Sequence, residues 1–166
     1  FFKNGTFLKM MLNSFWYALI ITVVTLLISY PAAYFLTKVK NSQIWLLLII
    51  LPTWINLLLK AYAFIGIFSN GGLFNQFLHL FGIGPVNFLF TDFAFIFVAS
   101  YIEIPFMILP IYSAIKEINP NLIQASEDLG ASHWQTFKYV LWPLSRPGVE
   151  SGIQAIFIPS LSLFML

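Results

Sequence analysis

The chain has 166 residues, of which 60% are hydrophobic and only 8% are charged, whereas a soluble domain carries about 25% charged residues. Eight basic and six acidic side chains cannot cover the surface of a soluble fold, which excludes a soluble enzyme and a disordered chain. The net charge of +2 is too small for a nucleic-acid-binding surface, and the absence of cysteine excludes disulfides and thiolate metal sites. The composition indicates an integral membrane protein.

Two apolar segments in the first half of the chain are long enough to cross a bilayer as helices. A membrane-spanning helix needs about 20 apolar residues. The first candidate covers residues 12–37, with Pro31 near its far end. The second covers residues 44–68 and is interrupted by Pro52 and Lys60. We therefore expect two spans, the first with a kink at Pro31 and the second interrupted.

A glycine-rich loop separates these segments from a third span. Residues 69–91 contain four glycines and a proline, which is typical of a surface or re-entrant loop. Within it we expect one short helix at residues 73–81. The third predicted span covers residues 92–115 and contains Glu103 and two prolines.

The longest polar stretch covers residues 116–147, and a fourth apolar segment begins near Gly148 and runs to the last residue. Because the chain starts without Met and stops inside an apolar run, we expect it to be a piece of a longer permease-like protein. The prediction is an all-α polytopic transmembrane bundle in one domain, residues 1–166, with about four spans.

The distribution of basic residues predicts the orientation of these spans, since positive charge in short loops marks the cytoplasmic side. One side carries five basic residues and the other carries two: Lys38, Lys40, Lys116, Lys138 and Arg146 against Lys3 and Lys9. This bias places residues 116–147 in the cytoplasm. The first span then runs from outside to inside.

The polar stretch predicts two short helices joined by a turn. Asn119 and Pro120 form a helix start, and Gly130 lies where that helix should stop. Ser132 followed by Gln135 is a capping-box pattern that opens a second helix, which we expect Pro143 to end. Each helix has one apolar face, formed by Leu122, Ala125, Ser126 and Leu129 in the first and by Trp134, Phe137 and Leu141 in the second.

Physical reasoning alone leaves two interpretations of this helix pair. Both helices are too short to span a bilayer. They are either an interfacial loop lying on the membrane surface or a docking element whose apolar residues enter a groove on a partner.

The spacing of the motif residues resembles the Glu-Ala-Ala loop of ABC importer permeases: Gln124-Ala125-Ser126, then Gly130, then Val140-Leu141-Trp142-Pro143. The family pattern has an acidic residue at the position of Gln124, Ala at that of Ser126, Ile at that of Val140 and Leu at that of Trp142. Further segments are similar to spermidine/putrescine permeases, namely residues 51–54, 60–63, 103–112, 149–152 and 157–161.

The resemblance implies the membrane subunit of a type I importer. By this analogy Ala125, Ser126 and Gly130 form the turn that couples to a separate ATPase, with Leu129 and Ala131 packed beside it. Such a subunit pairs with a second permease subunit, and an extracytoplasmic solute-binding protein delivers the solute. The family lies in the inner membrane and translocates small solutes, here spermidine or putrescine.

The chain has no motif for handling ATP itself, because it lacks a Gly-x-x-x-x-Gly-Lys-Ser/Thr loop. We therefore expect no cofactor, with ATP bound by the partner ATPase, and no enzyme activity. His79 and His133 lie in different regions, so no catalytic or metal site is expected. The alternatives are a permease for another small solute, a gradient-driven carrier and a membrane-embedded enzyme.

Several residues inside the predicted spans are candidates for the solute path. Glu103 is a cation contact or a structural group, because an ionisable residue inside a span normally faces a partner or a path. Lys60 either snorkels to the interface or pairs with Glu103. Trp54, Tyr62 and Tyr101 form an aromatic box for an ammonium group or serve in packing.

Overall fold

The computed structural model describes the backbone of residues 5–163 and the side chains of residues 8–162. Lys3, one of the two basic residues on the predicted outer side, lies outside the described residues. This part of the chain is built from helices and contains no β-strand. The expectation of an all-α chain is therefore confirmed.

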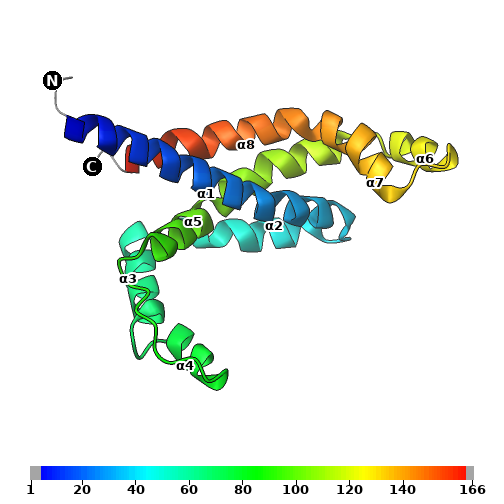
Figure 1. Cartoon of the computed structure of the whole chain (residues 1–166). Helices are drawn as coiled ribbons and strands as arrows, with labels where there is room; N and C mark the ends of the chain where they lie inside the picture. Colours follow the sequence, from blue (N-terminus) through cyan, green and yellow to red (C-terminus); the bar gives the residue numbers. More distant parts are fainter. Residues whose placement is uncertain (1–4, 164–166) are drawn as a thin grey trace.

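Three long helices pack against one another and form the body of the molecule (Figure 1). They are α1 (Gly5–Lys38), α5 (Asp92–Glu117) and α8 (Trp142–Leu163). Their shared core includes Ala33, Met107, Ile111 and Ile156, each with no exposed surface. Pro31 lies inside α1, and Pro105 and Pro110 lie inside α5, without ending either helix. The first and third predicted spans are thus single helices, each slightly longer than expected.

Two glycines allow α5 and α8 to approach closely. A Cβ at Gly152 would lie 2.5 Å from the Met107 Sδ atom, and one at Gly148 would lie 2.5 Å from the Pro110 carbonyl oxygen. Small residues four positions apart permit this contact between membrane helices. The small residues at the start of the predicted fourth span therefore lie at a helix–helix interface.

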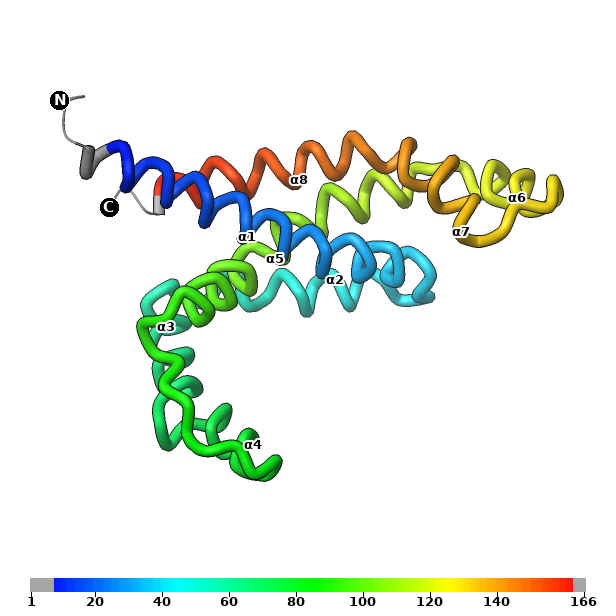
Figure 2. The backbone as a smooth tube through the Cα atoms, viewed as in Figure 1, coloured from blue at the N-terminus to red at the C-terminus, as the bar shows by residue number. Residues whose placement is uncertain are grey.

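The second predicted span is broken at Pro52, as expected. It consists of α2 (Ser42–Ile50), the 3₁₀ turn η1 (Leu51–Trp54) and α3 (Leu57–Phe68), with extended backbone at Ile55. Proline lacks the N–H group that donates the helical hydrogen bond, and α2 gives way to the 3₁₀ turn that contains Pro52. Pro31, Pro105 and Pro110 lack the same donor without ending their helices, so Pro52 alone does not account for the break at Ile55. Lys60, in contrast, lies inside α3 and interrupts nothing. The chain changes direction at the break: α2 runs along the body, whereas α3 leaves it at a steep angle (Figures 1 and 2).

The loop after α3 contains the short helix α4 (Leu73–Leu80), which agrees with the predicted helix. The buried Asn75 side chain fixes this loop. Its Nδ2 atom donates to the carbonyl oxygens of Ser69 at 3.0 Å and Val86 at 3.1 Å, and its Oδ1 atom accepts from the Val86 amide at 2.9 Å. The loop thus returns the chain to Thr91, whose hydroxyl caps α5.

Among the described residues, three segments are long and apolar enough to cross a membrane: Leu8–Lys38, Leu57–Leu80 and Asp92–Glu117. The segment Ser42–Trp54 is apolar but shorter. The predicted fourth span forms part of α8, which starts at Trp142 and so begins before Gly148. This helix is not one of the three segments that are long and apolar enough to cross a membrane. That α8 crosses the membrane therefore remains a prediction.

Candidate functional site

The loop between α5 and α8 begins with α6 (Pro120–Asp128), and its start forms as predicted. The Asn119 Oδ1 atom accepts a hydrogen bond from the Asn121 amide at 3.0 Å, and Pro120 occupies the first turn. The Asn119 side chain satisfies a backbone amide that has no partner inside the helix. Pro120 has no amide hydrogen, so it leaves no donor unsatisfied at its position. The local sequence thus determines where α6 starts.

Gly130 ends α6 in a left-handed conformation, with φ of +81°. The Gly130 amide donates to the Glu127 carbonyl at 2.9 Å, and the Ala131 amide donates to the Ser126 carbonyl at 3.0 Å. This pair of bonds is the Schellman arrangement, in which glycine avoids the strain that a Cβ would add. The predicted turn is confirmed, and its shape depends on this glycine.

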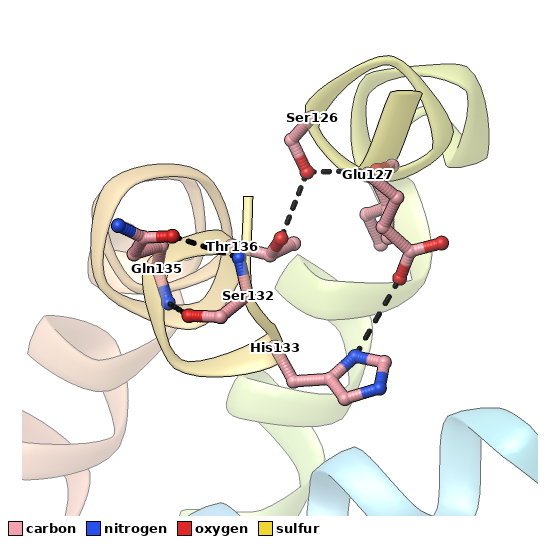
Figure 3. A network of polar contacts seen from close by, with 7 residues as sticks. Ser126, Glu127, Ser132, His133, Gln135 and Thr136 are labelled. Carbon is pink, nitrogen blue, oxygen red and sulfur yellow. Dashed lines mark hydrogen bonds and ion pairs between the residues drawn. The ribbon is translucent and has the colours of Figure 1, made fainter. Parts of the chain in front are cut away.

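The helix α7 (His133–Thr136) follows and opens with the predicted capping box (Figure 3). The Ser132 amide donates to the Gln135 Oε1 atom at 2.8 Å, and the Gln135 amide donates to the Ser132 Oγ atom at 3.3 Å. The Ser126 and Thr136 hydroxyls, 2.9 Å apart, join α6 to α7 (Figure 3). The two helices are therefore held as one unit.

The prediction that Pro143 ends this second helix is wrong. The chain continues from α7 through the π-helical turn η2 (Phe137–Leu141) directly into α8, and Pro143 lies in the first turn of α8. In the wider turn, the Trp142 amide donates to the Phe137 carbonyl, five residues earlier. This change of hydrogen-bonding register accommodates a residue that lacks an N–H group. The loop is consequently continuous with a long helix of the body.

The tip of the loop presents apolar side chains to its surroundings. Leu129 is 88% exposed. Gln124 and Ala125 are also exposed, and Ala131 is half-buried. The analogy placed Leu129 packed beside the turn, but within this chain it projects outward. Such an apolar tip on a well-ordered turn suits insertion into a partner.

The predicted apolar face of the second helix points back toward α1. The Trp134 and Phe137 rings stack with their centroids 5.3 Å apart, and Leu141 is buried. All three line a cavity of about 380 Å³ together with Tyr34 of α1. The helix pair therefore has one face on the body and one face free.

Sequence reasoning missed Tyr30, which connects α1 to this region. Its hydroxyl is hydrogen bonded to the Ser145 hydroxyl of α8 at 2.7 Å. Its ring lies 5.8 Å from that of Phe137 and 5.4 Å from that of Trp142. Nothing in the sequence distinguishes Tyr30 from the other aromatic residues of the spans, because its role depends on residues more than 100 positions away.

Glu103 is 8% exposed and forms no hydrogen bond or ion pair with the described residues. It lies on the same face of α5 as Ser100 and Met107, and Met107 contacts α8 at Gly152. The Ser100 hydroxyl is also buried without a hydrogen-bond partner. The predicted pair with Lys60 is not formed in the described part of the chain, so Glu103 is an isolated polar group.

The three aromatic residues of the predicted box do not surround one cavity. Tyr101 and Lys60 line a cavity of about 180 Å³, and neither Trp54 nor Tyr62 contributes to its wall. Trp54 is 84% exposed and Tyr62 is 71% exposed. A role for these residues in the solute path remains a prediction.

Long apolar helices joined by an ordered loop with an exposed apolar tip define the class of this protein as a polytopic, all-helical membrane protein. The chain belongs to the family of binding-protein-dependent transport system inner membrane components, whose family model matches residues 2–166. It is thus a multi-pass protein of the inner membrane.

Curated relatives are transport permeases. The spermidine/putrescine transport system permease protein PotB of Escherichia coli (strain K12) is 37% identical over 162 residues, covering 95% of this chain and 59% of that protein. PotB of Haemophilus influenzae is 35% identical over 165 residues, covering 97% of this chain and 58% of that protein. The inner membrane ABC transporter permease protein YdcU of Escherichia coli is 33% identical over 162 residues, covering 88% of this chain and 51% of that protein. The chain therefore spans between half and three fifths of the length of these relatives.

Proposed function

We propose that this chain is part of a permease subunit of an ATP-driven importer that carries a small solute, spermidine or putrescine, across the inner membrane. The observation that carries the proposal is the exposed turn at Gly130, which is closed by two backbone hydrogen bonds and is followed by a helix that continues into α8. The polyamine assignment is supported by relatives named for spermidine/putrescine transport.

In this proposal residues 116–147 lie in the cytoplasm and the Gly130 turn enters a groove of a separate ATPase subunit. Leu129 supplies the apolar anchor, and Gln124, Ala125, Ser126 and Ala131 flank it. We propose that the partner binds ATP, since the sequence contains no phosphate-binding loop motif, and we expect no cofactor in this chain. Movement of the turn is transmitted to α8 because no loop separates α7 from α8.

The proposed assembly has two further partners. A second permease subunit completes the path through the bilayer, and an extracytoplasmic solute-binding protein delivers the solute to the outer face. Glu103 is the proposed cation contact inside the membrane, because it is buried and unpaired. Trp54, Tyr62 and Tyr101 are proposed as less direct contributors, since they do not share a cavity.

Uptake of labelled spermidine and putrescine tests this function in cells with and without the full-length gene. We expect uptake to collapse on deletion and to return when the gene is supplied on a plasmid. Unchanged uptake after deletion would contradict the polyamine assignment. The second candidate, a permease for another small solute, is favoured by the similarity to YdcU, which is named only as an ABC transporter permease.

A further inference from the structure

A cleft of about 420 Å³ lies between α1, α3 and α5, near the end of α5 that is opposite to the Gly130 loop. Residues from all three helices line it, among them Tyr17, Phe64, Phe68, Asp92 and Phe95. The charge bias of the loops places the Gly130 end in the cytoplasm, so this cleft opens toward the outer face of the membrane.

Aromatic rings form much of the cleft wall. Phe64 and Phe68 of α3 are stacked, with centroids 6.1 Å apart and planes 19° from parallel. Across the cleft, Tyr17 of α1 contacts Phe95 of α5 at 6.1 Å and 75°. The cleft wall therefore contains aromatic rings from three different helices.

Asp92 is the only charged residue among those that line the cleft. It is exposed, it forms no ion pair with the described residues, and the Tyr17 hydroxyl interacts with it. The cavity beside Tyr101 differs in this respect, because Lys60 lines it and would repel a cation. Of the two cavities, only the outer one combines a carboxylate with aromatic walls.

We propose that the outer cleft is a binding site for a linear polyamine, with an ammonium group of the solute on the Asp92 carboxylate. Aromatic ring faces attract ammonium groups, and the apolar walls accommodate the methylene segments between them. A solute carrying a free carboxylate would be repelled by Asp92, which disfavours anions at this site. This inference rests on the proposed function and places a first contact for the solute outside the buried region of Glu103.

The test uses the complete transporter, with the full-length chain and its partner subunits, reconstituted in proteoliposomes. We expect Asp92→Asn to raise the KM for putrescine and spermidine about tenfold with little change in maximal rate, because a charge-assisted contact is lost. Asp92→Glu retains the charge and should stay close to wild type. Glu150→Gln removes a carboxylate of α8 that pairs with Arg146 at 2.8 Å, and serves as the control for loss of a carboxylate outside the cleft.

Two further variants keep the proposal testable if Asp92→Asn lowers the abundance of the transporter. Phe64→Leu and Phe95→Leu preserve apolar volume and remove a ring, so each should raise KM by several-fold. Unchanged KM values in all variants of an active transporter would overturn the site and leave the cleft as a lipid-facing surface. A wild-type transporter that takes up neither polyamine would overturn the proposed function, and this inference with it.

Discussion

The hydroxyl groups of Tyr30 and Ser145 lie 2.7 Å apart in the interior and join α1 to α8 across 115 positions of sequence. The Tyr30 ring also contacts Phe137, the first residue of the π-helical turn, and Trp142, the first residue of α8. The helix that continues from the Gly130 loop is therefore attached to α1 near the start of α8. A displacement of the loop would move both helices together.

Tyr30→Phe should weaken this attachment while leaving the ring contacts in place. The Ser145 hydroxyl retains a bond to the Trp142 carbonyl at 3.2 Å, so the loss of stability should be about 1 kcal/mol. If the contact between Tyr30 and Ser145 transmits movement, the reconstituted Tyr30→Phe transporter should hydrolyse more ATP than wild type for each solute molecule imported. Parallel measurement of ATP hydrolysis and uptake gives this ratio.

Tyr112→Phe is the matched control, because Tyr112 donates to the Ser42 hydroxyl at 2.8 Å and joins α5 to α2 instead. It removes the same kind of bond from a contact that does not involve α8. An unchanged ratio in Tyr30→Phe, or an equal change in both variants, would refute a specific role for Tyr30.

Gly130→Val should abolish copurification of the ATPase without greatly lowering the abundance of the permease. A β-branched residue is strained at φ of +81°, at a cost of about 1–2 kcal/mol, so the turn should rearrange. No atom lies within 4 Å of the added Cβ, so packing does not oppose the substitution. Affinity purification of the tagged permease, followed by quantification of the bound ATPase, measures the effect.

Gly66→Val provides the comparison, since Gly66 in α3 has equally open space around its Cβ position. That variant should retain the ATPase. Retention of the ATPase by Gly130→Val as well would show that the conformation of the turn is unimportant for docking.

Gly152→Val should separate α5 from α8, because the new side chain would meet the Met107 sulfur atom. Overpacking of this kind costs roughly 1–3 kcal/mol. We expect a lower midpoint of thermal unfolding in detergent, and partial recovery when Met107→Ala is added. Ala155→Val, at an exposed position of the same helix, should have little effect. A midpoint that is unchanged by Gly152→Val would contradict the observed closeness of the two helices.

Glu103→Gln should slow polyamine uptake without lowering the amount of protein in the membrane. The amide keeps the size of the side chain and removes the charge that would attract an ammonium group. Because Glu103 forms no ion pair with the described residues, the substitution breaks no such contact within them. Uptake kinetics together with immunoblotting of membranes would separate a transport defect from a folding defect. Normal kinetics would assign Glu103 a structural role.

The break in the second predicted span shows where local rules stop being sufficient. Pro52 predicted the interruption, because a missing amide donor acts on its own helix. The direction that α3 then takes, away from the body, depends on packing with α4 and α5 and could not be predicted from that residue. Pro143 misled the prediction for a related reason, since a π-helical turn before it let the helix continue.

The sequence by itself determined that this is a membrane protein and where the first and third spans lie. It also determined both ends of α6 and the start of α7. These features follow from composition and from hydrogen bonds between residues a few positions apart, as at Asn119, Gly130 and Ser132. Only the tertiary structure decided that Tyr30 meets Ser145 and that Tyr17 and Asp92 share a cleft. Those contacts join residues that are distant in sequence, so they exist only once the helices have packed.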